Sequence, residues 1–291
     1  MGRVERLPTA LGYSPLAIRQ EDIPQSNNGF PGSKEEFRVY MDNLPFEQRV
    51  KEGEMLFRDL RMAASELADF LFWQTVEDTR MILEGKRVVA DKSATIVGLV
   101  GFHSPESAFW GMKVYMGNRG HRVIIFHPEA PLNVRPMKIQ EVPFMRLLEQ
   151  VKEEIGDDND LVVVGHSRGA ILNMITAIRH PDFHRSVVSR SINLGGPIPE
   201  WVNSTLGQPY LWWQDIFGGD DFSLSELRDS VDELNSLNFT SLGSPNDLVV
   251  RGIHPGKFIR INGSHSGMPS NRKEVLPKIG EIISGKLNLA A

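Results

Sequence analysis

Short apolar runs alternate with helical patterns after Lys86, and this alternation restricts the fold more than any other feature of the chain. Helical patterns at residues 143–155 and 170–179 fall between several of the runs. Short buried strands separated by helices favour a mostly parallel sheet that is covered on both faces, so the predicted class is α/β. The runs that predict strands are residues 95–100, 122–126, 161–164, 187–194, 240–242 and 257–261.

The N-terminal third of the chain departs from this alternation. Residues 1 to about 44 contain clusters of Pro, Gly, Asn and Ser, which predict an irregular arm. From Pro45 to Gly85, apolar residues recur at helical spacing and predict one long amphipathic helix or two shorter ones. Four aromatic residues in this segment favour packing against the body of the protein: Phe57, Phe70, Phe72 and Trp73.

A second departure lies at residues 196 to about 237, where aromatic residues stand among polar ones. This insertion predicts a cap or lid over one edge of the sheet. The predicted organisation is therefore an N-terminal arm and helical extension (1–90), a core (91–285) that contains the insertion, and a short C-terminal tail (286–291).

Composition excludes several classes of site and partner. A formal net charge of -5 gives no electrostatic reason to expect nucleic acid or an anionic membrane as a partner. The absence of cysteine excludes disulfides, thiolate metal sites and a cysteine nucleophile. We find no apolar segment typical of a signal peptide and no run of about 18 apolar residues. The chain is thus predicted to be cytoplasmic, without a membrane span.

The strongest local motif is Gly165-His166-Ser167-Arg168-Gly169. It matches G-x-S-x-G, in which a serine at a sharp strand-to-helix turn needs small neighbours two positions away on either side. Four apolar residues precede the motif and a helical pattern follows it, as such a turn requires. The motif therefore predicts that Ser167 is a nucleophile.

A serine nucleophile needs a base, and the base needs an acid that orients it, in the chain order Ser, Asp or Glu, His. His265 lies in the small-residue loop Gly263 to Gly267 after an apolar run, and is the predicted base. Asp247 lies in a turn after the run 240–242 and is the predicted acid. The rivals are histidines and aspartates in helix ends, turns or the insertion: His180, His184, His254, Asp220, Asp221, Asp229 and Asp232.

The oxyanion formed during acyl transfer needs two backbone N–H donors. Arg168, which follows the nucleophile, is predicted to supply one; Phe102 is predicted to supply the other, with His103 as the alternative. The residues predicted to contact substrate are His103, His166, Trp212 and Trp213.

Taken in order, these motifs resemble the bacterial lipase and esterase branch of the α/β-hydrolases. The resemblance covers about residues 90 to 285 and includes the run from Ile96, the elbow, Gly195-Gly196-Pro197, the aspartate turn and His265-Ser266-Gly267. The sequence departs from that branch at Val100, where a histidine is usual, and at Ala170, where a second glycine is common. The resemblance implies an α/β-hydrolase fold and hydrolysis of a carboxylic ester.

The predicted function is a serine hydrolase that forms an acyl-enzyme on Ser167 and needs neither a metal nor another cofactor. Its substrate is expected to be a small ester with an apolar acyl group. Three alternatives remain open: a thioesterase, an acyltransferase with the same triad, and an inactive binding protein that retains the fold. The N-terminal helices are a candidate surface for homo-oligomer formation.

Overall fold

The central element of the protein is a six-stranded parallel sheet with the strand order β2-β1-β3-β4-β6-β8. The computed structural model describes residues 34–84, 93–102, 104–126, 137–203, 205, 224–245 and 247–286. Each run that the sequence marks as a strand contributes to this sheet, which confirms the predicted α/β class. The run 187–194 was placed too early, because Val187 ends a helix and the strand begins at Arg190. The strands are β1 (Ala94–Leu99), β2 (Arg122–Phe126), β3 (Asp160–His166), β4 (Arg190–Leu194), β6 (Phe239–Gly243) and β8 (Lys257–Arg260).

Both faces of the sheet are buried because successive side chains of a strand point to opposite sides. In β3, Val162 and Val164 belong to one apolar cluster, while Leu161 and Val163 belong to the other. All four side chains are fully buried. A strand with two buried faces must be apolar at every position, and this explains why the sequence shows continuous runs here rather than alternation.

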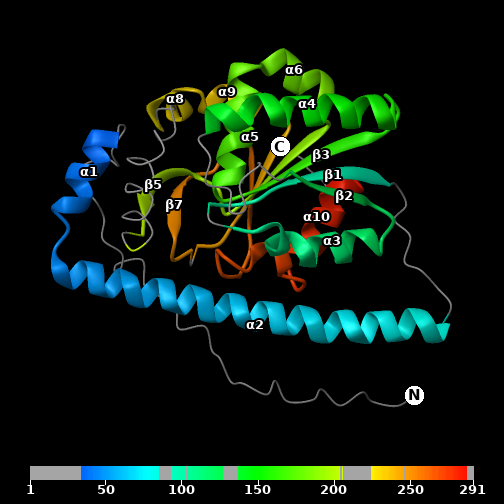
Figure 1. Ribbon diagram of the computed structural model, residues 1–291, viewed down its shortest axis with the longest axis horizontal. Coiled ribbons are helices and arrows are strands. Elements are labelled where there is room, and N and C mark those ends of the chain that lie inside the picture. The colour runs from blue at the N-terminus through cyan, green and yellow to red at the C-terminus, as the bar shows by residue number, and fades with distance from the viewer. Residues whose placement is uncertain are drawn as a thin grey trace.

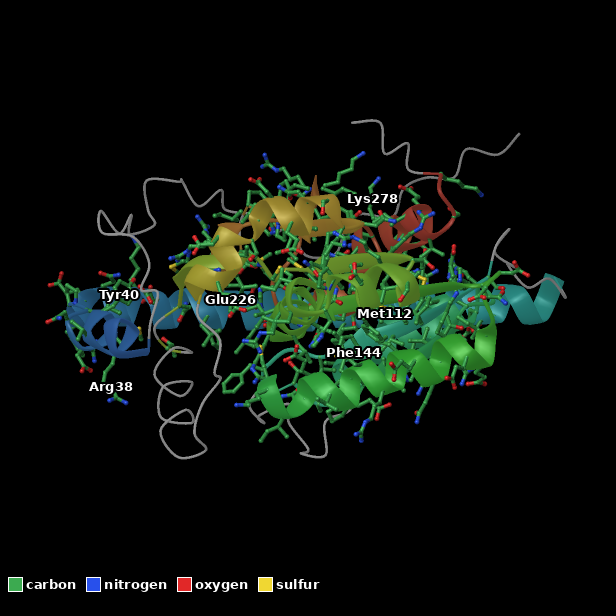
Figure 2. All side chains as sticks on the ribbon, turned by 90° about the horizontal axis from the view of Figure 1, so that it is seen from above. Arg38, Tyr40, Met112, Phe144, Glu226 and Lys278 are labelled. Carbon is green, nitrogen blue, oxygen red and sulfur yellow. The ribbon has the colours of Figure 1, made fainter. Side chains whose placement is uncertain are left out.

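Helices cover the two faces, as Figure 1 shows. Met112 of α3 and Phe144 of α4, both labelled in Figure 2, are buried in the two different clusters, one on each side of the sheet. One face is covered by α3 (Trp110–Gly117) and α10 (Val275–Ile283), with the short helices η2 (Glu106–Phe109) and η3 (Met268–Ser270) nearby. The other is covered by α4 (Met137–Ile155), α5 (Arg168–Arg179), α6 (Pro181–Val187) and α9 (Val231–Ser236).

A second, two-stranded sheet was not expected from the sequence. In it β5 (Ile198–Val202) pairs antiparallel with β7 (Val250–Ile253), and the register shifts between Pro199 and Trp201. The start of the predicted cap is therefore a strand, and α8 (Leu224–Asp229) and α9 form its end. Residues 206–223 lie outside the described part of the chain, so a cap over the sheet edge stays a prediction.

The N-terminal segment forms α1 (Lys34–Asp42), so the prediction of an irregular arm is wrong for residues 34–42. It continues as one unbroken helix, α2 (Phe46–Glu84), which runs along the body on the side of α3 (Figure 1). The orientation of α2 corrects the prediction that its aromatic residues pack against the body. Phe70 is buried and meets Trp110 edge to face at 5.4 Å, but Phe57, Phe72 and Trp73 are exposed. Much of the face toward the body is polar and makes hydrogen bonds there. Within the described part of the chain, no helix has the length and hydropathy needed to cross a bilayer.

Candidate active site

Ser167 occupies the turn between β3, which ends at His166, and α5, which begins at Arg168. Its backbone angles are φ 52° and ψ -121°, and it is the single non-glycine residue with positive φ among those described. Such a conformation costs about 1–3 kcal/mol and persists only where the surroundings enforce it. A strained serine at a strand-to-helix turn is the geometry of a nucleophile elbow.

The glycines of the motif are required because the elbow is tightly packed. A side-chain carbon at Gly165 would lie 2.5 Å from Cα of Ala170, and one at Gly169 would overlap the carbonyl oxygen of Leu99. Ala170 is accommodated because a glycine, Gly196, faces its methyl group. The departure from the usual second glycine therefore does not disturb the elbow.

His265 and Asp247 form a buried pair at the carboxyl end of the same sheet. Nδ1 of His265 donates to Oδ2 of Asp247 at 2.7 Å, and both side chains are about 5% exposed. The other carboxylate oxygen, Oδ1, accepts the backbone N–H groups of Val249 (2.8 Å) and Val250 (2.9 Å). This fixes the carboxylate, and the carboxylate in turn fixes the imidazole tautomer with the hydrogen on Nδ1. The lone pair of Nε2 is then the basic one.

The electrostatic surroundings favour the charged form of His265. Burial alone would lower its pKa, but the charge of Asp247, the hydrogen bond to that carboxylate and the charge of Asp59 raise the pKa above its ordinary value. An imidazolium formed during proton transfer is stabilised in such surroundings.

The glycine pair that follows β4 lies next to both Ser167 and His265. A side-chain carbon at Gly195 would lie 3.1 Å from Nδ1 of His265, and one at Gly196 would lie 2.8 Å from the carbonyl oxygen of Ser167. The structure thus brings the three residues of the predicted triad to one end of the sheet. Their catalytic roles stay predictions.

His166 supports the loop that carries His265. Its Nε2 lies 2.9 Å from the carbonyl oxygen of His265, which can only accept, so Nε2 carries the hydrogen. Burial, followed by the charge of His265, lowers the pKa of His166 to about 3, so the ring is neutral. The ring also lies 5.1 Å from that of His265. His166 was predicted to bind substrate; the structure buries it beside His265, and a contact with substrate stays a prediction.

The two predicted oxyanion donors lie in segments that border Ser167. Phe102 is half-buried in the turn after β1, and a side-chain carbon at neighbouring Gly101 would lie 3.2 Å from Cβ of Ser167. Arg168 is the first residue of α5 and directly follows Ser167. These placements suit an oxyanion site. His103, Trp212 and Trp213 lie outside the described residues.

The rival histidines lie in other surroundings. His184 stacks on Phe239, lies 3.2 Å from Oγ of Ser191, and has its pKa lowered by burial to about 4. His180 pairs with Glu141 at 3.2 Å. His254 packs against Phe258, with ring centroids 4.6 Å apart.

Helix α2 contributes two carboxylates that the sequence interpretation missed. Asp59 accepts the backbone N–H groups of His265 (2.6 Å) and Ser266 (3.1 Å). Glu66 accepts from the backbone N–H (3.1 Å) and the hydroxyl of Ser264. The spacing of seven residues, which puts both carboxylates on one face of a helix, was the available signal.

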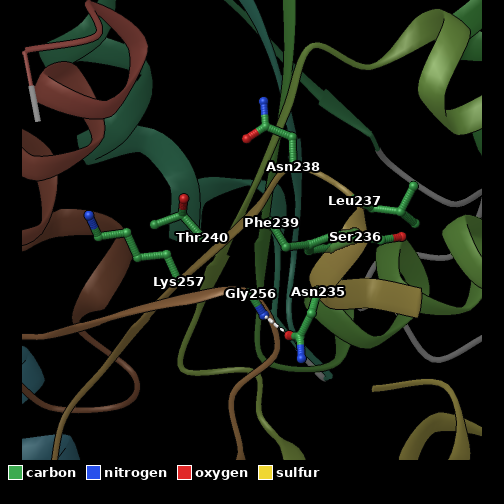
Figure 3. Close-up of a pocket in the computed structure, with 8 residues that line it drawn as sticks. All are labelled: Asn235, Ser236, Leu237, Asn238, Phe239, Thr240, Gly256 and Lys257. Atoms are coloured by element: carbon green, nitrogen blue, oxygen red, sulfur yellow. Dashed lines mark hydrogen bonds between the residues drawn. The ribbon is translucent and has the colours of Figure 1, made fainter. Parts of the chain in front are cut away.

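A surface hollow of about 600 Å³ lies elsewhere, at the amino ends of β6 and β8 (Figure 3). Asn235 closes part of it by accepting the N–H of Gly256 at 2.6 Å. Ligands of parallel sheets bind beyond the carboxyl ends of the strands, so this hollow is not part of the site around Ser167. Among the described residues, no group of three His, Asp or Glu side chains is arranged to hold a metal ion.

Comparisons with known proteins give matches at the level of structure. No protein-family model matches this sequence, and no curated protein matches it. Polyneuridine aldehyde esterase is similar in structure at 14% identity, over 66% of this chain and 99% of that one, with a TM-score of 0.45. A soluble variant of the monoglyceride lipase of Saccharomyces cerevisiae is similar at 11% identity, over 70% and 88%, with a TM-score of 0.47. An α/β hydrolase from the metagenome of lagoon sediments is similar at 16% identity, over 68% and 93%, with a TM-score of 0.45.

The class of fold follows from the molecule's own geometry. A parallel sheet carries a strained serine on a strand-to-helix turn, and an aspartate and a histidine follow in that chain order at the same end of the sheet. The chain has the α/β-hydrolase fold.

Proposed function

We propose that this protein is a serine hydrolase that cleaves a carboxylic ester through an acyl-enzyme on Ser167. The observation that carries the proposal is the buried His265–Asp247 pair, joined at 2.7 Å, beside the strained turn that holds Ser167. Backbone strain and a buried carboxylate both cost stability, and a fold keeps them together where they serve chemistry.

In the first step Nε2 of His265 accepts the hydroxyl proton of Ser167 while the oxygen attacks the ester carbonyl carbon. The developing negative charge is held by the N–H groups of Arg168 and Phe102. His265 then gives its proton to the leaving alcohol, and the acyl group remains on Ser167. Water, deprotonated by the same imidazole, releases the carboxylic acid and restores the serine.

The position of the carboxylate explains its part in this sequence. Asp247 binds Nδ1–H and keeps the basic lone pair on Nε2, and its charge stabilises the imidazolium of the intermediate. Because Oδ1 is held by two backbone N–H groups, the carboxylate needs no reorganisation as the proton moves.

A series of p-nitrophenyl esters of increasing acyl length tests the proposal. Wild-type protein should release p-nitrophenol, whereas Ser167→Ala and His265→Ala should lose nearly all turnover. Val142→Ala, at an exposed position of α4, is the control and should retain it. Turnover by Ser167→Ala equal to that of the wild type would refute the proposal. Transfer of the acyl group to an added alcohol instead of water would identify an acyltransferase.

A further inference from the structure

The loop that carries His265 is built around two carboxylates of α2. It reads Gly263-Ser264-His265-Ser266-Gly267. Its three central residues donate hydrogen bonds to Asp59 and Glu66. Asp59 is fully buried, and its two oxygens divide between the N–H of His265 and the N–H and hydroxyl of Ser266. The first of these contacts joins residues 206 positions apart in the sequence.

The glycines at the two ends of the loop have the same explanation. A side-chain carbon at Gly263 would lie 2.9 Å from Oε1 of Glu66, and one at Gly267 would overlap Oε2. Glu66 also accepts from Nδ2 of Asn271 at 3.0 Å. Serines that donate and glycines that leave space make this loop complementary to the carboxylates of α2.

We propose that Asp59 and Glu66 are positioning residues, through which α2 holds the backbone of the His265 loop so that the imidazole faces Ser167. This inference rests on the proposed function. Asp59 acts on the base in two ways, because it fixes the N–H of His265 and places a negative charge near the ring. A helix joined to the loop by these hydrogen bonds is part of the catalytic unit rather than an appendage.

The charged and titratable groups that face His265 determine how the charge of Asp59 can be detected. They are Asp247 from the turn after β6, His166 from β3 and Asp59 from α2, while Glu66 faces the neighbouring Ser264. The charge of Asp59 contributes to the raised pKa of His265, so removing that charge should let the ring lose its proton at lower pH. A purely structural helix would not produce this change.

The test is the rate of labelling by a fluorophosphonate, measured against pH for wild type, Asp59→Asn, Glu66→Gln and Ser266→Ala. Asp59→Asn should be labelled roughly 10- to 100-fold more slowly than wild type, as for a displaced catalytic group. The acid limb of its pH–rate profile, where labelling slows because His265 becomes protonated, should move to lower pH. Ser266→Ala keeps the charge, so it should be slower with an unmoved acid limb. Glu47→Gln removes an exposed carboxylate from the same helix and should match wild type.

Labelled wild type together with an Asp59→Asn variant of equal rate and equal acid limb would overturn the inference alone. Wild type that is not labelled at all would overturn the proposed function first. If circular dichroism shows that Asp59→Asn does not fold, Glu66→Gln and Ser266→Ala decide. Both must be slower than Glu47→Gln, and equality overturns the inference.

A separate observation concerns the outward face of α2, where apolar side chains between 43% and 79% exposed form one stripe. Successive members are three, four or seven residues apart, which is the heptad spacing of a two-helix seam. Exposed Ala64 lies within one interval of seven, and Gly53, which faces Thr205, lies within the other. The stripe consists of Phe46, Val50, Phe57, Leu60, Leu67 and Leu71.

From this stripe we infer that a second copy of the chain pairs with α2 in antiparallel orientation. A twofold axis midway between positions 58 and 59 places each member of the stripe opposite another member, as a twofold interface requires. The facing residues are Phe57 with Leu60, Phe46 with Leu71, and Val50 with Leu67.

The charges beside the stripe agree with this partner. The same register brings exposed Glu54 near exposed Arg61 of the second copy, once on each side of the axis. The nine acidic and five basic residues along α2 disfavour an anionic lipid surface as the occupant, because basic residues predominate on helices that bind such surfaces. A second copy of the chain therefore fits both the apolar and the charged positions.

Light scattering at several concentrations tests the pairing. Wild type should have twice the mass of the chain, Leu60→Glu should be monomeric, and Val142→Glu, at an exposed position of α4, should remain dimeric. Glu54→Arg should weaken the dimer, and the double variant Glu54→Arg/Arg61→Glu should restore it. A monomeric wild type, whether or not it binds lipid vesicles, or an unchanged Leu60→Glu would overturn the inference.

Discussion

His166 makes the stability of the fold sensitive to acid, and replacing it with glutamine tests the electrostatics of the elbow. The pKa of His166 is about 3 in the folded chain because the ring is buried, against about 6.5 for an unfolded chain. A histidine with a lowered pKa is neutral when folded, so the unfolded state binds a proton first as pH falls. At pH 5 this lowers the free energy of unfolding by about 2 kcal/mol relative to neutral pH, since one pKa unit corresponds to about 1.4 kcal/mol.

His166→Gln keeps an N–H that can donate to the carbonyl of His265 but cannot titrate. Urea unfolding at pH 7 and pH 5 should show that the wild type loses about 2 kcal/mol more than the variant between the two conditions. Val142→Gln, with the same amide at an exposed position of α4, should follow the wild type. If the free energies of unfolding of wild type and His166→Gln differ by the same amount at pH 7 and at pH 5, the ring of His166 is not buried and neutral.

Three further predictions concern the site and its support. Asp247→Asn should lower kcat by roughly 10³- to 10⁴-fold in the ester assay. The amide oxygen cannot accept from Nδ1–H of His265 without losing its hydrogen bonds to the two backbone N–H groups. A kcat within tenfold of wild type would contradict this prediction. The acid limb of kcat/KM should lie above the ordinary histidine value of about 6.5, since the raised pKa keeps His265 protonated to higher pH, and a limb below that value would count against the pairing. Gly169→Ala should lower the free energy of unfolding by at least about 2 kcal/mol in urea, because the methyl group would overlap the carbonyl of Leu99; an unchanged midpoint would show that the elbow has room.

The strands and the elbow at Ser167 could be predicted from the sequence because both are local signals. A strand buried on two faces is apolar at every position, so 161–164 and 122–126 stand out without knowledge of their neighbours. The elbow needs glycines at fixed offsets, and Gly165 and Gly169 show that need directly. The expected chain order of serine, acid and base then restricted the candidates for the acid and the base, and led to Asp247 and His265.

What could not be predicted depends on contacts between distant segments. Periodicity showed that α2 is amphipathic but not which face turns inward, because the inward face carries the charged residues Asp59 and Glu66 where apolar residues were expected. Their partners lie about 200 residues away, and only the folded chain brings Ser264 and His265 to them. The β5–β7 pair was missed for a similar reason: its strands are four or five residues long, and one contains Pro199.

The most direct test of the central claim is the identity of the residue that a fluorophosphonate modifies. We expect a single labelled peptide that contains Ser167, with labelling lost in His265→Ala although that variant remains folded. Label on another residue, or none on a folded wild-type protein, would contradict the claim that Ser167 is an activated nucleophile.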